Sequence, residues 1–235
     1  MPAERYFLTA DFHNGQSAIL EGTEFHHLVN VMRSQAGESV ELVNGRGSLA
    51  KATIERLEKK KAHLVIDNVF VQEPQKDVVI LAQAIPRINR LDFILEKGTE
   101  LGMTHVWLFP GDRSERKNFT ESQLERLPNI CISAMKQCGR LYVPEISLKP
   151  VLSKWTKPEH SLYFGDVHPE APLLENVMKG PRRGIIFCVG PESGFSDQEE
   201  NVLRSLGGTG VKLHHNILRT DTAAVAALAI ITHRF

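Results

Sequence analysis

Two glycine-containing loops and a set of arginines are the parts of this sequence best suited to chemistry. The apolar run Ile185–Val189 leads directly into Gly-Pro-Glu-Ser-Gly, residues 190–194, and such a run is typical of a buried parallel strand. Glycine permits backbone conformations that side chains forbid, and Pro191 fixes one φ between the two glycines. A loop of this kind presents backbone N–H groups at the carboxyl edge of a sheet, where α/β proteins bind ligands. Taken alone, the loop is explained more simply as a tight turn between a strand and a helix.

A second loop, residues 213–219, has the same relation to the predicted sheet. The segment Gly210–Leu213 is expected to be a short strand, and the polar loop after it carries His214 and His215. Adjacent histidines suggest a metal site, but neighbouring side chains point apart and no Cys or carboxylate lies at ligand spacing. We therefore expect no metal.

Cationic residues follow another predicted strand, His105–Phe109. Arg113, Arg116 and Lys117 lie in the segment Gly-Asp-Arg-Ser-Glu-Arg-Lys, and Arg140 comes just after the Gly that ends a long predicted helix. Loop arginines are commonly only solvated charge. Because these arginines follow sheet elements, where functional loops gather, a binding site for an anion or for RNA is supported about as well as the explanation by solvated charge.

A helix predicted over Glu24–Ser34, ended by Gly37, has an apolar face and a polar stripe. The apolar face consists of Phe25, Leu28, Val29 and Met32, and the polar stripe consists of His26, Asn30 and Arg33. The stripe is explained most simply as the solvated side of the helix. It could instead contact phosphates or bases, since Arg and Asn pair well with both.

Composition restricts the class of protein more than its function. The chain has 235 residues, enough for one or two domains, and its 28 Lys and Arg balance its 28 Asp and Glu. Net charge therefore gives no support to a nucleic-acid partner, and any such site must be a local patch. Cys131, Cys138 and Cys188 form no CxxC pair and are expected to be free thiols. The N-terminus has no apolar signal region and no apolar run could span a bilayer, so we expect a soluble cytoplasmic protein.

Two patterns of secondary structure meet near Pro74. Before it, three β segments are predicted, with an Asn-Gly hairpin turn after the first: Ser39–Val43, Ser48–Leu57 and Ala62–Val71. We expect a small β-barrel carrying one helix over residues 1–73.

After residue 74, apolar strands alternate with helices, which predicts a mostly parallel sheet covered by helices over residues 74–235. The predicted strands are Val78–Ile85, His105–Phe109, Leu162–Phe164, Ile185–Val189 and Gly210–Leu213. The predicted helices are Leu91–Leu101, Glu121–Gln137, Leu173–Met178, Asp197–Leu206 and Thr222–Arg234. Ser196 and Glu199 form a capping box for the fourth helix, and Thr220 or Asp221 is expected to cap the last one. The alanine-rich surface of the last helix suits close packing.

Together these segments resemble the RsmE family of SPOUT-superfamily methyltransferases, which modify N3 of a uridine in small-subunit ribosomal RNA. The order and spacing of short motifs carry the resemblance, which runs the length of the chain. The matching segments are His27-Leu28 with Val31-Met32-Arg33 and Gly37, Thr99–Gly102, Ser114–Arg116, Gln137–Arg140, Gly190–Glu192 with Gly194–Ser196, and Ile217–Ala223.

The resemblance implies a fold and a reaction. Residues 1–73 would form a PUA-like β-barrel for RNA binding, and residues 74–235 an α/β catalytic domain tied in a deep trefoil knot. S-adenosyl-L-methionine (SAM) would be the cofactor, small-subunit ribosomal RNA the substrate, and the protein a homodimer that needs no metal.

The resemblance also implies roles for individual residues. The SAM pocket would be formed by Leu81, Phe164, Gly190, Pro191, Glu192, Gly194, Leu213, Ile217, Leu218 and Arg219. RNA would be bound by His27, Arg33, Arg113 and Arg116. Arg116 and Arg140 would stabilise the uridine anion, and Glu192 is the candidate general base or, alternatively, only caps its loop.

The chain departs from the family pattern in both pocket loops. Ser193 stands where the family usually has Gly, and His214 and Asn216 stand where it has Gly and Arg. A positive φ at Ser193 would cost about 1 kcal/mol. The adenine contacts near His214 are therefore expected to differ in detail, and contact of this loop with RNA is weakened.

Other classes of function remain open. One is a non-catalytic RNA-binding protein whose α/β domain only dimerises, which the retention of both pocket loops disfavours. Another is a nucleotide-binding enzyme that uses Gly190–Gly194 as a phosphate cradle, which the absence of the usual Lys-Ser/Thr disfavours. A related SPOUT methyltransferase with a different target nucleotide is a third.

Overall fold

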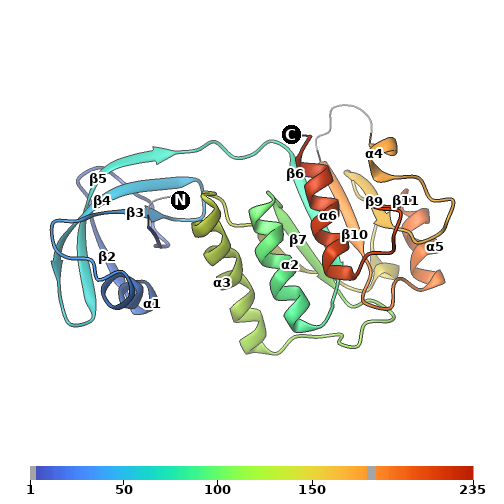
Figure 1. Cartoon of the computed structure of the whole chain (residues 1–235), viewed down its shortest axis with the longest axis horizontal. Helices are drawn as coiled ribbons and strands as arrows, with labels where there is room; N and C mark the ends of the chain where they lie inside the picture. Colours follow the sequence, from blue (N-terminus) through green and yellow to red (C-terminus); the bar gives the residue numbers. More distant parts are fainter. Residues whose placement is uncertain (1–3, 179–183, 235) are drawn as a thin grey trace. The chain divides into compact units, whose positions relative to one another are not determined.

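The chain divides into two compact units in a computed structural model that describes residues 4–178 and 184–234 (Figure 1). The first unit comprises Met1–Pro74 together with Ile132–Val143, and the second comprises Gln75–Cys131 together with Pro144–Phe235. The sequence patterns did not anticipate that residues 132–143 pack with the first unit. Met1–Ala3, part of the N-terminal segment read as lacking a signal region, lie outside the described residues.

The first unit is built on a five-stranded sheet with the order β1-β3-β4-β5-β2. Its strands are β1 Arg5–Phe7, β2 Ser17–Glu21, β3 Ser39–Val43, β4 Ser48–Leu57 and β5 Lys61–Val71. β1 pairs with β3 in parallel, whereas the other pairs are antiparallel. Register shifts between Lys51 and Ala52 and between Ile54 and Arg56 bend β4 against β5, because an extra residue increases the local twist.

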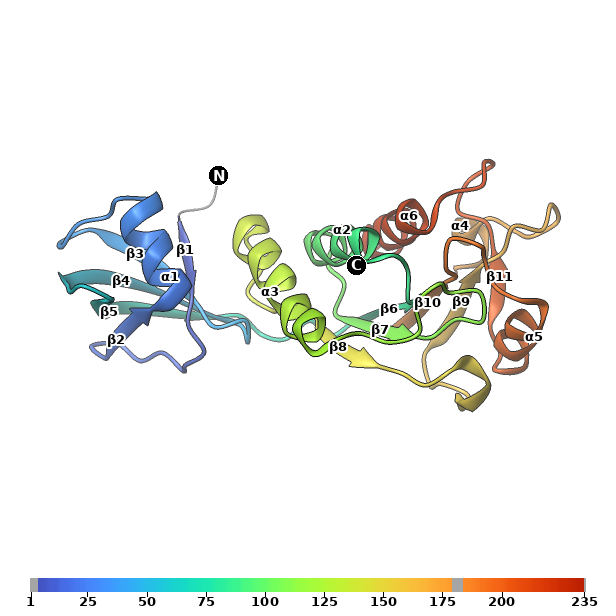
Figure 2. The same cartoon turned by 90° about the horizontal axis from the view of Figure 1, so that it is seen from below.

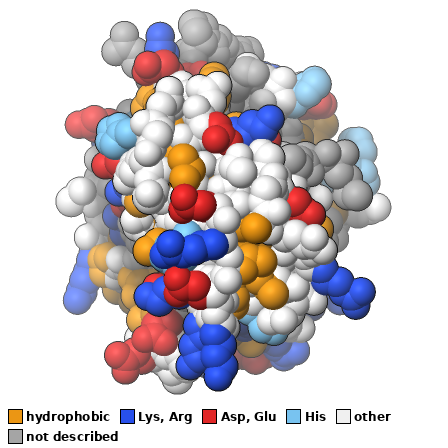
Figure 3. Space-filling view, turned by 90° about the vertical axis from the view of Figure 1, so that its left-hand side faces the viewer, with side chains coloured by type: hydrophobic (Ala, Val, Ile, Leu, Met, Phe, Trp, Pro, Cys, Tyr) orange, Lys and Arg blue, Asp and Glu red, His pale blue; other side chains and the backbone are white. Residues whose placement is uncertain are grey.

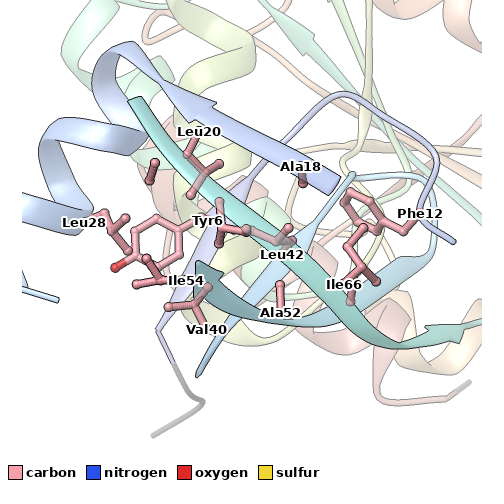
Figure 4. Close-up of a cluster of buried hydrophobic side chains, with 13 residues drawn as sticks. Tyr6, Phe12, Ala18, Leu20, Leu28, Val40, Leu42, Ala52, Ile54 and Ile66 are labelled. Carbon is pink, nitrogen blue, oxygen red and sulfur yellow. The ribbon is translucent and has the colours of Figure 1, made fainter. Parts of the chain in front are cut away.

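The core of this unit lies on the concave side of the bent sheet (Figure 4). Tyr6, Leu42 and Ile54 from three different strands are fully buried there together with Leu28 from the helical segment. Val40 and Leu42 of β3 and Ala50, Ala52 and Ile54 of β4 alternate with more exposed residues and belong to this core, as the period of a half-buried strand requires. The predicted β3–β4 hairpin is confirmed.

The helical segment differs from the single α-helix predicted over Glu24–Ser34. A short helix α1, Gly22–His26, continues into a π-helical turn η1, His27–Val31. The wider turn changes the rotation of the residues that follow, so Met32 is 45% exposed and does not join the apolar face. Placing Met32 on that face was therefore wrong, whereas Leu28 is buried as predicted.

The second unit is a six-stranded sheet with the order β11-β9-β10-β6-β7-β8, in which every pair is parallel. Its strands are β6 Val78–Ala84, β7 His105–Phe109, β8 Glu145–Leu148, β9 Ser161–Gly165, β10 Gly184–Val189 and β11 Thr209–Val211. Its helices are α2 Ile88–Glu100, α4 Leu174–Val177, α5 Asp197–Ser205 and α6 Thr220–Thr232, with a single 3-10 turn η2, Leu152–Lys154. Helix α3, Glu121–Cys138, has residues in both units.

Helices cover both faces of this sheet, with α2 and α6 on one face and α5 with η2 on the other (Figure 2). Strand β6 places buried side chains on both faces of the sheet. Ile80, Ala82 and Ala84 pack into the core beneath α5, so the residues between them, including Leu81 and Gln83, point to the face that α6 covers. Both faces are buried, which explains the nearly continuous apolar runs.

The alternation of strands and helices predicted after residue 74 is confirmed, with three exceptions. The short edge strand β8 was not predicted, because four residues at a sheet edge give little apolar signal. Strand β11 ends at Val211, so Leu213 belongs to the loop. The N-cap of α6 is Arg219 and makes no side-chain hydrogen bond, so the prediction that Thr220 or Asp221 caps this helix was wrong. None of the described helices is long and apolar enough to cross a bilayer.

Candidate active site

A cavity of about 790 Å³ lies where the carboxyl ends of β9, β10 and β11 meet. These three strands are neighbours in the parallel sheet, so the loops that leave them converge at one edge. The loop after β10 and the loop after β11 are the two that the sequence singled out, and both line the cavity. A volume of this size suits a ligand of drug or cofactor size.

Most residues predicted for the pocket line this cavity. They are Gly190, Pro191, Glu192, Gly194, Leu213, Ile217 and Leu218, and Arg113 joins them. The structure places three others elsewhere. Leu81 and Phe164 lie fully buried in the core, and Arg219 is exposed at the start of α6.

Gly190 and Gly194 are required for different reasons. A Cβ on Gly190 would lie 3.0 Å from the backbone N of Phe195 and 3.1 Å from the carbonyl C of Gly194, so the loop can fold back only onto a bare backbone. Gly194 instead has a φ of 72°, and a Cβ there would meet nothing within 4 Å. The N–H of Gly194 donates to the carbonyl O of Pro191 at 2.9 Å and closes the turn. Backbone freedom is therefore needed at Gly194, and close approach at Gly190.

Ser193 causes no backbone strain in this loop. Among the described residues, Arg33 is the only non-glycine with positive φ, so Ser193 does not adopt the left-handed conformation considered above. Its carbonyl O accepts a hydrogen bond from Nη1 of Arg113 at 3.3 Å. The departure from the family glycine is therefore tolerated at this position.

The carboxylate of Glu192 is held by the start of α2. Its Oε1 accepts from the backbone N of Arg87 at 3.1 Å and lies 3.3 Å from Nε of Arg90. Arg90 also pairs with Oδ1 of Asp221 at 2.8 Å. These side chains are only about one-fifth exposed, at 20% for Arg90 and 23% for both carboxylates, so the pairs tie the 190–194 loop to α6.

One side of the cavity is acidic, and the sequence analysis missed it. Asp166, at the carboxyl end of β9, is buried, accepts from the backbone N of His168 at 2.8 Å and pairs with Arg204 at 2.7 Å. Glu200 of α5 also lines the cavity, and burial, followed by the nearby charge of Asp166, raises the pKa of its carboxyl above the usual value. The carboxyl-edge argument, applied to the predicted strand Leu162–Phe164, would have pointed to Asp166.

The arginine-containing loop after β7 is attached to the start of α5. The capping box of α5 is confirmed, with Oγ of Ser196 accepting from Glu199 and Oε2 of Glu199 accepting from the backbone N of Ser196 at 2.9 Å. Oε1 of Glu199 accepts from the backbone N of Asp112 at 2.9 Å, so this buried carboxylate also fixes the loop that carries Arg113. Arg116 is exposed beyond it and bonds Oε1 of Gln123 at 3.1 Å.

The other predicted RNA-binding residues lie in the first unit. His27 stands at the start of the π-helical turn, and its Nδ1 is 3.4 Å from Oε1 of Glu4. Arg33 is exposed just after that turn with φ of 58°, and Arg140 follows the end of α3. On the face of the molecule seen in Figure 3, Lys and Arg side chains are interspersed with Asp and Glu rather than gathered in one patch.

The cavity lining combines carboxylates, cations and apolar surface, so it suits a ligand with both charged and apolar parts. Carboxylates line one side, and Ile217 projects with 81% of its surface exposed on another. Within residues 4–178 and 184–234, no group of three or more His, Cys, Asp or Glu could hold a metal ion. Burial raises the pKa of the Cys188 thiol, as is usual for a cysteine inside an apolar core.

Two family models match the chain in agreement with its two patterns of secondary structure. A model described as an RNA methyltransferase domain matches residues 72–232, and one described as an RNA methyltransferase PUA domain matches residues 20–67. The first model covers more than half of the chain and contains both cavity loops.

Individual relatives match over nearly the whole chain. The ribosomal RNA small subunit methyltransferase E of Bacillus subtilis is 28% identical over 249 residues, covering 98% of this chain and 96% of its own length. A Legionella pneumophila protein solved with bound SAM has a TM-score of 0.89 at 28% identity and covers 100% of this chain and 98% of its own. The ribosomal RNA small subunit methyltransferase E of Neisseria gonorrhoeae, solved with S-adenosyl methionine, has a TM-score of 0.86 at 30% identity, with the same coverage of 100% and 98%. This chain therefore belongs to the ribosomal RNA small subunit methyltransferase E (RsmE) family.

Proposed function

We propose that the protein transfers a methyl group from SAM to N3 of a uridine in small-subunit ribosomal RNA. The observation that carries this proposal is the cavity at the carboxyl ends of β9, β10 and β11, lined by the same two loops that match the family motifs. Family membership supports the reaction class, and the uridine N3 position rests on the family resemblance alone.

The residues present fit SAM. The bare backbone at Gly190 lets the 190–194 loop fold back on itself, and the residues of this loop line the cavity. Asp166 and Glu200 provide negative charge for a ligand that carries a sulfonium and an ammonium. Ile217 and Leu218 provide apolar surface for the adenine, and Phe164 and Leu81 support the sheet behind the site.

When bound, SAM supplies the methyl group, and the chain has to bind and orient the uridine while its N3 proton leaves. The N3–H bond breaks and the new N3–C bond forms as the bond from carbon to sulfur breaks. We assign Arg116 and Arg140 to stabilising the negative charge on the uridine, because fixed cations favour the anion that attacks. Glu192 is the candidate for accepting the proton, and since its ion pairs use Oε1, its Oε2 would do so.

RNA would contact residues of both units in this proposal. His27 and Arg33 would bind it from the first unit, and Arg113 and Arg116 from the second. Arg33 has the left-handed conformation that ends the helical segment, where the backbone N of Ser34 donates to the carbonyl O of Leu28 at 3.0 Å, and its exposed position supports this role.

We further propose that the second unit is knotted and that the protein is a homodimer. In support of the knot, the chain runs from β11 at the sheet edge past the 190–194 loop to α6, which covers β6 and β10. The dimer rests on the family resemblance. Ala224 and Ala227 of α6 are buried within the subunit, so only the remaining alanines of this helix are available to a partner.

Separate calorimetric titrations with SAM, ATP and NAD test which cofactor the protein binds. We expect binding of SAM only. We also expect mass spectrometry to find 3-methyluridine in small-subunit RNA that has been incubated with the protein and SAM. A methylated base other than uridine would retain the enzyme class but overturn the target, and binding of ATP in place of SAM would overturn the class.

Arg33→Ala and Arg116→Ala separate RNA binding from cofactor binding. Each is expected to leave SAM affinity within about twofold while methyl transfer falls at least tenfold, because neither residue lines the cavity. Equal losses of both activities would place these arginines in the cofactor site. Light scattering at micromolar concentration tests the dimer, and a monomer that transfers methyl groups at full rate would overturn it.

A further inference from the structure

Gln83 is a fully buried polar residue inside an apolar strand. It lies next to the last residue of β6, with 0% of its surface exposed, among neighbours that are all buried. Burying an amide costs free energy unless its hydrogen bonds are restored. The partners of Gln83 therefore indicate why the strand has a polar residue here.

The amide nitrogen of Gln83 joins two segments that are distant in sequence. Its Nε2 carries two N–H groups and has four acceptors within reach, namely the carbonyl O of the neighbouring Ala84 at 2.9 Å, Oγ1 of Thr220 at 3.0 Å, and the carbonyl O atoms of Gly190 at 3.3 Å and Val189 at 3.5 Å. The two shortest bonds go to Ala84 and Thr220. The hydroxyl of Thr220 in turn donates to the carbonyl O of Gly190 at 2.7 Å. Gln83 is thus connected to Gly190 through Thr220, and we call this connection the Gln83 clamp.

The Gln83 clamp connects the two loops of the cavity. Gly190 begins the loop after β10, and Thr220 ends the loop after β11 as the first residue of α6, and both line the cavity. Gln83 itself is not among the lining residues. Its effect on a ligand is therefore exerted through the loops.

The oxygen of the same amide supports a specific role over simple packing. Among the described residues, Oε1 of Gln83 has no hydrogen-bond partner although it is buried. A Met side chain of similar size would avoid this unpaired acceptor. The amide is thus retained at a cost, and what it provides is the set of bonds from Nε2.

We propose that Gln83 is a positioning residue that fixes the separation of the two cofactor loops through Thr220 and Gly190. The inference rests on the proposed function, in which the cavity binds SAM. Holding both loops in place before the ligand arrives lowers the entropy lost on binding.

The test uses Gln83→Met, Thr220→Val and the double variant. Thr232→Val is the matched control, because Thr232 lies on the same helix and bonds only the carbonyl of Leu228 within its own turn, at 2.8 Å. Thr220→Ser restores the hydroxyl and is the rescue variant. SAM affinity is measured by calorimetry, and hydrogen exchange of the amides in residues 190–194 and 213–219 is measured without ligand.

Each single variant is expected to weaken SAM binding five- to twentyfold and to speed exchange in both loops at once. The double variant is expected to have about the same SAM affinity as the single variant that binds SAM less tightly, because the two side chains act as one unit. Thr232→Val should resemble the unchanged protein, and Thr220→Ser, which keeps the hydroxyl, should bind SAM more tightly than Thr220→Val does. If Gln83→Met does not fold, a comparison of SAM affinity between Thr220→Val and Thr220→Ser tests the same connection.

The outcomes separate this inference from the proposed function. If the unchanged protein binds SAM and the clamp variants match it in affinity and loop exchange, the clamp is refuted and the function stands. A lower melting temperature with unchanged affinity and exchange would show a merely structural role and would also refute it. If the unchanged protein binds no SAM, the proposed function fails, and loop exchange still decides whether the clamp exists.

Discussion

The two loops of the cavity differ sharply in how they are held. The 190–194 loop closes on itself through the bond from Gly194 to Pro191 and is tied outward through Glu192 to α2 and through Ser193 to Arg113. In the 213–219 loop, the backbone N of Asn216 donates to Nδ1 of His214 at 3.1 Å, and Ile217 is 81% exposed. One wall of the site is therefore fixed along its whole length, whereas the other is fixed at its end through Thr220 and presents apolar surface that a ligand can cover. Substitutions in the first wall should change affinity together with local order, and those in the second should change affinity alone.

The largest effect is expected at Gly190. Gly190→Ala places a methyl group 3.0 Å from the backbone of Phe195, which cannot move without opening the turn, so we expect SAM affinity to fall about 10- to 100-fold. Gly194→Ala meets no atom within 4 Å but keeps the left-handed strain, so about fivefold is expected. Gly15→Ala is the control for left-handed strain, because Gly15 has a φ of 76°, a Cβ there would meet nothing within 4 Å, and it does not line the cavity. Calorimetry and thermal unfolding of the three variants test this order, and equal affinities for Gly190→Ala and Gly194→Ala would contradict it.

The next effect concerns the ion pairs that fix the first wall. Arg90→Met removes the partner of Glu192 and Asp221 at once, and the partly buried charges left behind should reduce SAM affinity about tenfold. Lys97→Met is the matched control, because it breaks ion pairs with Glu96 and Glu100 within the same helix, and none of these residues lines the cavity.

Glu192→Gln then tests the two roles of that residue. If Glu192 accepts the uridine proton, methyl transfer at saturating SAM should fall far more than SAM affinity does. A parallel loss of both would leave Glu192 as a residue that only holds its loop.

A smaller effect is expected in the second wall. Ile217→Ser should lower SAM affinity about three- to tenfold, because the ligand no longer covers an apolar side chain, which is worth about 1.5–3 kcal/mol when fully buried. The melting temperature should not change, since this side chain is exposed without ligand. Leu148→Ser, on the exposed edge strand β8 outside the cavity lining, should change neither quantity. A drop in melting temperature for Ile217→Ser would show that this wall is also preorganised.

The smallest effect is a pH-dependent one at Glu200. Because the pKa of Glu200 is raised in the folded protein, the folded state binds this proton more tightly than the unfolded chain, and ionisation costs stability above that pKa. Glu200→Gln should therefore raise the melting temperature slightly at neutral pH, and the difference should vanish well below pH 4.5, the ordinary value, where both states are protonated. SAM affinity should fall about twofold through the lost negative charge. Thermal scans at both pH values test the sign, and a stabilisation that grows in acid would reverse it.

Much of the fold was predictable because its signals are local. Strands β3, β4 and β7 were predicted with their observed bounds, since each is a regular apolar or alternating run bounded by turn residues. The capping box at Ser196 was predictable for the same reason, as it needs only two side chains three residues apart. The π-helical turn at His27 and the position of Met32 were not, because the register of a helix depends on what its side chains pack against.

The sequence by itself determined which loops could bind a ligand, but only the tertiary structure decided what surrounds them. Gly190–Gly194 and the 213–219 loop were recognisable from strand ends and glycine positions, which are properties of neighbouring residues. Asp166 follows a predicted strand and could have been recognised in the same way. Gln83 could not, because it meets Thr220 and Gly190 only through the strand order β11-β9-β10-β6, which brings together segments far apart in the chain. The role of a buried amide in an apolar strand can be inferred only once its hydrogen-bond partners are known. Long-range pairing of this kind leaves no periodic pattern in the sequence, so its effect on the site became visible only once the sheet was assembled.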